Sequence, residues 1–447
     1  MRNKQSVQSI VCGDYVVTMN DERNIIKQGA IAVDSGVIVD VGSRQDIQRK
    51  YQSRNWVDGT DQVVMPGLIN GHTHAAMCLL RGFADDIPLM EWLQDYINPI
   101  EAHAVSEDYV RVGTQLACWE MLVGGTTTFV DMYFFHEISA QVVDEIGMRA
   151  LISASMMDQS RNDAVDIEDS FEQAERFVNV WSARRSTVVP ILAGHAIYTL
   201  KNAHLIRLRE MAQELNAPVH IHVSESKFEI DFSRRTYGTT PISHFEEIGL
   251  LEVPIIAAHV VWPEDNEIKT LARKGVGVIH NPTCNARIAS GTAPVVELQA
   301  SGVNVGLGTD GAASSNNLDM WEEMRVASLM QRARTMDSTV LPANKLLKMA
   351  TSQCAAAIGM DSSIGKLAPG MGADIIQVSI DNAHHLPMYD VESHLAYSSG
   401  CRDVSNVFVN GNHLVRNRVP TTINTNQLKI DVQRHRQRIS SFNRMNA

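Results

Sequence analysis

The stretch VVMPGLINGHTH, residues 63–74, decides the fold. Its apolar run, rich in Val, Leu and Ile, is typical of a buried strand and ends at Gly71, just before His72 and His74. In an extended chain, residues two apart point to the same side, so both imidazoles can reach one point past the strand. Imidazole suits zinc and other borderline divalent ions. The pair therefore predicts part of a metal site, provided that the fold brings further ligands to the same place.

Size and composition limit the classes of protein to be considered. The 447 residues, 44% of them hydrophobic, suffice for one large domain and a smaller one. A net charge of −12 argues against nucleic acid and anionic membranes as partners. The expected partner is a small-molecule substrate. Six cysteines without a C-x-x-C pair indicate reduced thiols. Because no segment nears ~18 consecutive apolar residues and no signal peptide is evident, we expect a soluble, cytoplasmic protein.

Both ends of the chain have the pattern of short strands separated by turns. Residues 10–61 contain Val- and Ile-rich runs broken by Asp-Gly and Ser-Gly pairs, and a similar pattern with an Asn-Gly turn returns near the C-terminus. We predict a small β-sandwich domain built from residues 1–63 and 366–447, with a charged surface helix or tail after Lys429.

The middle of the chain alternates between strand-like apolar runs and stretches with helical periodicity. Eight strands alternating with helices fit a (β/α)8 barrel better than an open sheet. We therefore predict a distorted (β/α)8 TIM barrel over residues 64–365 as the metal-dependent catalytic domain. The predicted strands are Val63–Asn70, Thr126–Asp131, Arg149–Ser155, Val188–Gly194, Pro218–Val223, Pro254–His259, Val276–His280 and Val303–Thr309.

Residues that bind metals or move protons gather at the ends of these predicted strands. The carboxyl ends of barrel strands form one rim, where active sites are built, so we expect these residues to share one site. Besides the first pair, the strand-end residues are His195, His222, Glu225, His259 and Asp310.

Some of these histidines and acids have a structural alternative. His220 and His222 also form a His-x-His pair, and we interpret the deeper His220 as a packed or hydrogen-bonded histidine. Asp310 could instead cap the helix that follows its strand. The adjacent His384 and His385, in the β-rich tail, are expected at the surface.

Three histidines and one carboxylate would leave a position for water on a divalent ion, which lowers the pKa of water from ~15.7 toward ~7. Zinc suits this set first, with iron or manganese as alternatives. Glu225 lies close by without being needed as a ligand, so it suits proton transfer to a substrate nitrogen or leaving group. His259 could hold the water or stabilise developing charge. The pattern predicts metal-assisted hydrolysis of a C–N or similar bond.

Four segments carry a resemblance to a known family: PGLINGHTH, the H-x-x-E of HVSE, AAH at 257–259 and LGTDGAAS at 307–314. Together they resemble the amidohydrolase superfamily, in its branch with one metal and no carbamylated lysine. The run HTHAAMCLLRGFADDIPLMEWLQDYINPIEA is similar in particular to the 5-methylthioadenosine/S-adenosylhomocysteine deaminases. The likeness continues through GKLAPGMGADIIQV and spans nearly the whole chain.

The resemblance implies roles for the strand-end residues. Glu225 would be the general acid and base, with His259 and Asp310 positioning and deprotonating the water. The implied metal ligands are His72, His74, His222 and Asp310.

The implied activity is hydrolytic deamination of an adenosine-type nucleoside, such as 5-methylthioadenosine, S-adenosylhomocysteine or 5′-deoxyadenosine, with release of ammonia and the inosine analogue. Besides Glu225, the resemblance implies three contacts to that substrate. They are Trp92 as a pocket wall, Glu101 as a partner of ribose hydroxyls and His195 as a hydrogen-bond donor to the purine.

The chain departs from the family pattern around this implied pocket. AGHAIY at 193–198 lacks both prolines of the family's G-P-H-x-P-Y, and NPTCNAR at 281–287 places Cys284 where the family has Ser. Members that accept the homocysteine tail often carry an arginine where this chain has Ala154, for which the nearby Arg161 is a candidate replacement.

These departures leave a second function open, the hydrolytic deamination or dechlorination of another aminated heterocycle such as a triazine or pterin. A third, a non-catalytic scaffold, is disfavoured because all four implied ligands and Glu225 are present. Barrels of this size often pair through their helical outer face, so a homo-oligomer is an open expectation.

Overall fold

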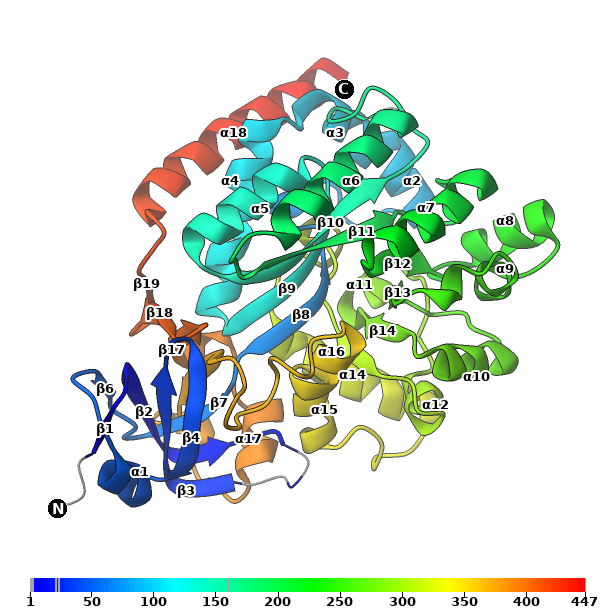
Figure 1. Cartoon of the computed structure of the whole chain (residues 1–447). Coiled ribbons are helices and arrows are strands. Elements are labelled where there is room, and N and C mark those ends of the chain that lie inside the picture. The colour runs from blue at the N-terminus through cyan, green and yellow to red at the C-terminus, as the bar shows by residue number, and fades with distance from the viewer. Residues whose placement is uncertain (1–3, 21, 23–24, 160, 447) are drawn as a thin grey trace.

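The computed structural model describes residues 4–20, 22, 25–159 and 161–446. Its centre is an eight-stranded parallel sheet in which the strands follow one another in sequence order, as in a barrel (Figure 1). The last strand returns beside the first, where the N–H of Asp310 donates to the carbonyl of His72 at 3.0 Å. The strands are β8 (Leu68–Thr73), β9 (Thr126–Tyr133), β10 (Arg149–Met156), β11 (Val188–Gly194), β12 (Val219–Val223), β13 (Ile255–His259), β14 (Gly277–His280) and β15 (Val305–Leu307). The predicted (β/α)8 barrel is confirmed.

Amphipathic helices pack on the outside of this sheet. Phe171 and Trp181 of α6 are fully buried, which shows how the apolar faces of the helices cover the strands. The helices that follow the strands are α4 (Glu107–Val123), α5 (His136–Ile146), α6 (Ile167–Ser182), α7 (Asn202–Leu215), α8 (Lys227–Tyr237), α9 (Pro241–Glu247), α10 (Asp265–Lys274), α11 (Pro282–Arg287), α12 (Val295–Ala300), α13 (Ala312–Ser315), α14 (Met320–Thr335), α15 (Ala343–Met349) and α16 (Ser352–Ala357), with the 3-10 turn η3 (Leu250–Glu252) after α9.

A helical excursion between β8 and α4 covers one side of the barrel mouth. Its elements are η1 (Ala75–Leu80), α2 (Leu89–Glu91), η2 (Trp92–Ile97) and α3 (Asn98–Ala104). The buried side of this excursion is a separate apolar cluster that includes Met77, Trp92 and Ile100.

The first predicted strand, Val63–Asn70, is wrong, because two strands of different sheets occupy that stretch. β7 (Gln62–Pro66) pairs with β16 (Ile375–Ser379), whereas β8 begins the barrel. The break lies at Pro66 and Gly67, where a Cβ on Gly67 would lie 2.1 Å from the hydroxyl oxygen of Thr127. The seven other strands begin and end within two residues of their predicted bounds.

Both chain ends contribute to one nine-stranded sheet, as their β-rich sequences predict. Its path runs β19-β18-β17-β16-β7-β2-β3-β4, with β6 beside β2. The Asn410-Gly411 turn between β17 and β18 has positive φ at both residues, as a tight hairpin requires. The elements not yet bounded are β1 (Gln5–Ser6), β2 (Ser9–Val17), β3 (Ile25–Asp34), β4 (Val37–Ser43), α1 (Arg44–Lys50), β5 (Tyr51–Gln52), β6 (Trp56–Val57), η4 (Ala383–His385), α17 (Val391–Tyr397), η5 (Cys401–Asp403), β17 (Val404–Val409), β18 (Asn412–Arg416) and β19 (Val419–Pro420).

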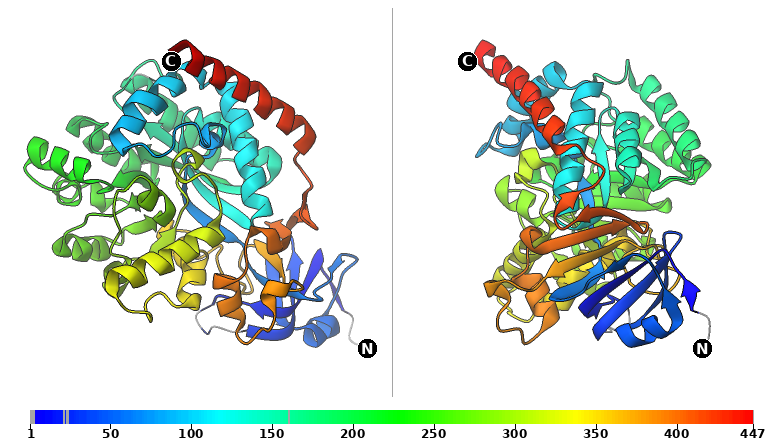
Figure 2. Two further views of the ribbon diagram at one scale, coloured as in Figure 1. Left: turned by 180° about the vertical axis from the view of Figure 1, so that it is seen from behind. Right: turned by 90° about the vertical axis from the view of Figure 1, so that its left-hand side faces the viewer.

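The C-terminal helix α18 (Thr425–Asn446) leaves this sheet and packs against α3 and α4 of the barrel (Figure 2). The division into a barrel domain at residues 64–365 and a smaller domain from the two ends stays a prediction. Within the described part of the chain, no helix combines the length and apolar character needed to cross a membrane.

Candidate metal centre and active site

Four predicted ligands converge at one point on the rim of the barrel. The Nε2 atoms of His72 and His74 each lie 3.1 Å from Oδ1 of Asp310, and Nε2 of His222 lies 3.3 Å from that of His74. One ligand atom from each of the four residues lies within 4.8 Å of the others. The chain therefore brings together residues that are more than 200 positions apart in the sequence.

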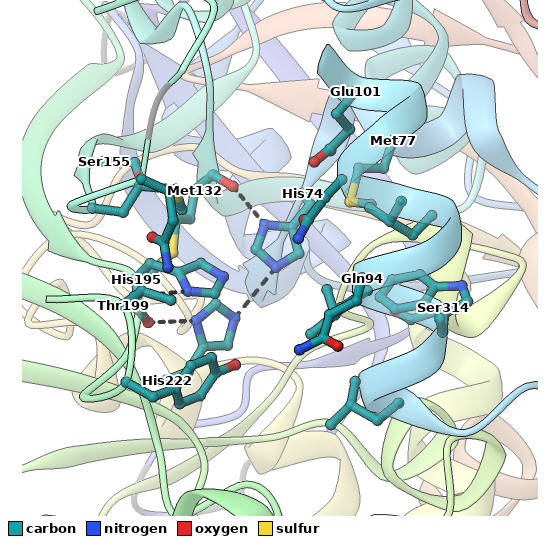
Figure 3. A pocket seen from close by; sticks show the side chains of 18 of the residues that line it. His74, Met77, Gln94, Glu101, Met132, Ser155, His195, Thr199, His222 and Ser314 are labelled. Carbon is teal, nitrogen blue, oxygen red and sulfur yellow. Dashed lines mark hydrogen bonds between the residues drawn. The ribbon is translucent and has the colours of Figure 1, made fainter. Parts of the chain in front are cut away.

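Hydrogen bonds behind two of these histidines fix which nitrogen faces the centre. Nδ1 of His74 lies 2.5 Å from the carbonyl oxygen of Met132, and Nδ1 of His222 lies 2.7 Å from that of His195 (Figure 3). A carbonyl only accepts, so each Nδ1 carries a proton and Nε2 is the nitrogen that can bind a metal. This is the arrangement that metal-binding histidines adopt.

The residues present fit a divalent ion. Ligands about 2.0–2.1 Å from a tetrahedral ion are separated by about 3.3 Å, which matches the 3.1–3.3 Å observed. Nε2 of His72 and Oδ1 of Asp310 are buried without a hydrogen-bond partner among the described residues. Burial acts to raise the pKa of Asp310, but the two neighbouring histidines hold it well below its ordinary value, so this predicted ligand stays anionic. A cation satisfies all of these atoms at once.

Glu225 lies beside this centre, and the carboxylate of Glu229 fixes its backbone through hydrogen bonds. The N–H groups of Ser224 and Glu225 donate to the two carboxylate oxygens of Glu229, at 2.9 and 2.7 Å. Ser224 has a φ of 51°, and these bonds stabilise that left-handed turn out of β12. Burial, and then the charge of Asp310, raises the pKa of Glu225 to about 8. A carboxyl group in that range can both take up and release a proton near neutral pH.

His259 faces Glu225, with 3.9 Å between its Nε2 and the carboxylate. The side-chain amide of Asn285 donates to Nδ1 of His259 at 2.9 Å, which leaves the proton on Nε2, toward the site. Burial lowers the pKa of His259 to about 4, so the ring is neutral at pH 7. His259 is therefore a neutral hydrogen-bond donor aimed at the space above the metal ligands.

The predicted substrate contacts line the same cavity, which has a volume of about 550 Å³. Glu101 comes from the excursion on one side, and His195 directly follows β11 on the other (Figure 3). Trp92, also from the excursion, lines the same cavity. Tyr133 donates to Glu101 at 2.6 Å, and burial raises the pKa of Glu101 to about 7. Nδ1 of His195 lies 3.2 Å from the hydroxyl of Thr199.

Arg161 also lines the cavity, but another side chain neutralises it. Its guanidinium donates to both carboxylate oxygens of Asp163, at 2.8 and 2.7 Å, and to the carbonyl of Ser155. Both side chains of this pair are at most 3% exposed. Asp163 also accepts from the N–H of Phe135 at 2.7 Å.

Three further residues around the metal ligands were not identified as functional from the sequence. Nε2 of His220 lies 2.9 Å from Nδ1 of His72, which confirms the interpretation of His220 as a hydrogen-bonded histidine and adds that its partner is a predicted metal ligand. Cys284 and Ser314 both donate to Oδ2 of Asp310, at 2.8 and 2.7 Å. The only sequence signal for Cys284 was its departure from the family's serine.

The family model "Amidohydrolase family" matches residues 63–414, which include every one of these side chains. The chain belongs to the amidohydrolase family. Among relatives, it is 41% identical over 404 residues to the 5-methylthioadenosine/S-adenosylhomocysteine deaminase of Thermodesulfovibrio yellowstonii, covering 90% of this chain and 92% of that protein. It is 40% identical over 408 residues to the 5′-deoxyadenosine deaminase of Methanosarcina mazei, with 91% and 92% covered.

Solved structures agree with this membership. An adenosine deaminase from Xanthomonas campestris with bound zinc aligns with a TM-score of 0.96 and 35% identity, over 98% of this chain and all of that one. The zinc complex of an atrazine chlorohydrolase from Arthrobacter aurescens aligns with a TM-score of 0.88 and 23% identity, over 96% of this chain and all of that one. At that identity the second likeness concerns the fold alone.

Proposed function

We propose that this protein is a metal-dependent hydrolytic deaminase of adenosine-type nucleosides. The observation that carries the proposal is the placement of Glu225, Glu101 and His195 around one cavity above the four metal ligands. The relatives of about 40% identity that cover nine-tenths of the chain support an aminopurine nucleoside as the substrate class.

Zinc is the ion that we propose for the centre, because three imidazoles and one carboxylate are a set that zinc favours. When bound, it would supply a water molecule of lowered pKa and polarise it for attack. His72, His74, His222 and Asp310 would hold it.

Glu225 carries the proton in the proposed reaction. Water adds to C6 of the purine, and Glu225 takes a proton from that water and delivers it to N1. The exocyclic amine leaves as ammonia after it receives the second proton of the added water, whose loss turns the new C6 hydroxyl into the 6-oxo group of the product. The N–H of His259 stabilises the charge that develops on the attacking oxygen. Asp310 accepts a hydrogen bond from the hydroxyl group that this oxygen forms.

The nucleoside is positioned from both sides of the cavity. Glu101 would accept from the ribose hydroxyls, with its carboxyl group oriented by Tyr133. Trp92 would form an apolar wall, and His195 would donate a hydrogen bond to the purine. We propose these three roles from the position of each side chain in the cavity.

We further propose that the favoured substrates carry an uncharged 5′ group, as 5-methylthioadenosine and 5′-deoxyadenosine do. Arg161, the candidate partner of a homocysteine carboxylate, is already bound bidentately by the buried Asp163. A ligand carboxylate would have to compete with that pair, and breaking a buried ion pair is costly.

A substrate panel on the zinc-loaded protein tests the proposal. The panel contains 5-methylthioadenosine, S-adenosylhomocysteine, 5′-deoxyadenosine, adenosine, a pterin and a chlorotriazine, with ammonia or chloride release and the loss of adenine absorbance as readouts. We expect the uncharged nucleosides to give the highest kcat/KM. Turnover of only the pterin or the triazine would replace the substrate class while keeping the chemistry, and turnover of none would contradict the proposal.

A further inference from the structure

A second group of side chains of the types that bind metals lies outside the barrel mouth, around helix α17. His384 and His385 end η4, Asp403 ends η5, and α17 lies between these two turns in the sequence. Helix α17, which is orange in Figures 1 and 2, packs against α15. It lies on the same side of the molecule as the nine-stranded sheet. None of these three residues lines the active-site cavity.

The side chains meet at distances that suit a metal ion. Nε2 of His384 lies 3.1 Å from each carboxylate oxygen of Asp403, and Nε2 of His385 lies 3.7 Å from Oδ2. Ligands of a tetrahedral zinc ion are separated by about 3.3 Å, so a small inward shift of His385 would complete the geometry. One ligand atom from each of the three residues already lies within 4.8 Å of the others.

His385 supplies the second, independent indication of a ligand. The adjacent histidines were expected at the surface, and this expectation is wrong for His385, which is fully buried. Neither of its ring nitrogens has a hydrogen-bond partner among the described residues. Burial lowers the pKa of His385, so the imidazole is in the neutral form that binds metals. Buried polar groups of native proteins are rarely left without a partner, and a bound ion would provide one.

The carboxylate of Asp403 is also oriented by its neighbours in a way that suits a metal ligand. Asp403 is only 2% exposed, and its oxygens accept from the N–H of Gly400 at 2.9 Å and the amide of Asn382 at 3.4 Å. These bonds orient the group. Nε2 of His384 is hydrogen-bonded to both of its oxygens, and a metal ion would take the place of the proton between them. Arg402 is mostly exposed and lies 3.9 Å away, beyond hydrogen-bond distance. The side chain of His384 is 30% exposed, which opens the site to water as a fourth ligand.

We propose that His384, His385 and Asp403 bind a second divalent transition-metal ion, with zinc as the first choice for two imidazoles and a carboxylate. The ion would tie η4 to η5 and so fix both ends of the segment that contains α17. It would have no part in the reaction, because the site does not open into the cavity. The second site does not depend on which substrate class the cavity accepts.

The test is a count of zinc ions per chain in the full-length protein. Protein stripped of metal is titrated with zinc, dialysed and measured by inductively coupled plasma mass spectrometry. We expect two ions per chain for the wild type, one for His385→Gln and one for Asp310→Ala, which lacks the active-site ion. His394→Gln is the matched control, because His394 is a neighbour whose Nδ1 already contacts the carbonyl of Asp390 at 3.0 Å. It should retain two.

A second variant covers the case in which His385→Gln does not fold. His384→Gln changes a partly exposed side chain and should also bind one ion, with unchanged kcat on the best substrate of the panel. One ion in the wild type that is lost in Asp310→Ala, or a folded His384→Gln or His385→Gln protein that binds as many ions as the wild type, would overturn the proposal. A thermal melt adds a separate readout, since the second equivalent of zinc should raise the Tm of the wild type but not of His384→Gln.

Discussion

The two ends of the active-site cavity are built on different principles. At the metal end, His74 and His222 each sit at the end of a barrel strand with a backbone carbonyl behind the ring. At the other end, Arg161 lies in the irregular segment between β10 and α6, and Asp163 cancels its charge. The residues proposed for the chemistry are therefore held by rigid strand ends, whereas the residue proposed to influence the choice of 5′ group lies in a connecting segment, where change is better tolerated.

The largest expected effect is at the metal end. Glu225→Gln keeps the size of the side chain but removes the group that moves the proton, so kcat should fall by ~10²–10⁴-fold for every nucleoside. Metal content should stay unchanged, because Glu225 is not a ligand. Steady-state kinetics and metal analysis on the same preparation check this, with the exposed Glu247→Gln as a control. Wild-type activity in Glu225→Gln would remove the central step of the mechanism.

The next effect separates metal binding from proton transfer. His220→Leu removes the hydrogen bond to Nδ1 of His72, so we expect zinc affinity to fall by about 10–100-fold. Zinc competition with a chromophoric chelator measures this directly. His280→Leu is the matched control, because His280 is another fully buried strand histidine whose ring nitrogens have no partner among the described residues. Equal losses in both variants would show that burial of a histidine, and not its contact with His72, controls the affinity.

The difference between the two ends also explains what the sequence alone could predict. Each strand has a local signal, and barrel topology places the carboxyl ends of all strands on one rim. The sequence alone therefore predicts that His72, His222 and Asp310 lie together. The start of β8 could not be placed in this way. Val63 and Leu68 are equally apolar, and only the pairing partners show that they belong to different sheets.

Contacts made by connecting segments had no such signal. The hydrogen bond from Cys284 to Asp310 depends on where the tertiary structure places α11 relative to the end of β15. The burial of His385 depends on how η4 and α17 pack. Both are set by tertiary structure, which periodicity does not report. The neutralisation of Arg161 is of the same kind. The sequence places an acid two residues away, but only the fold shows that the pair is buried and bidentate.

At the end of the cavity where Arg161 lies, Asp163→Asn should free the guanidinium of Arg161 while keeping an acceptor for the N–H of Phe135. A hydrogen bond to a charged group contributes about 1.5–3 kcal/mol, so the ratio of kcat/KM for S-adenosylhomocysteine over 5-methylthioadenosine should rise by ~10-fold or more. Kinetics with both substrates give this ratio for variant and wild type. An unchanged ratio, with 5-methylthioadenosine turnover intact, would mean that Arg161 does not face the 5′ tail.

The smallest effect returns to the metal end, at the position where the chain departs from its family. Cys284 and Ser314 both donate to the Asp310 oxygen that faces away from the other ligands. Cys284→Ser replaces a weak donor by a stronger one, and because Ser314 already holds the same oxygen, the net change should stay within about 1 kcal/mol. That corresponds to less than about fivefold in kcat/KM, with the same order of preference across the substrate panel. A change in that order would mean that the segment 281–287, beside the predicted metal ligands, also selects the substrate. Catalysis and selection of the 5′ group would then not be divided between the two ends of the cavity.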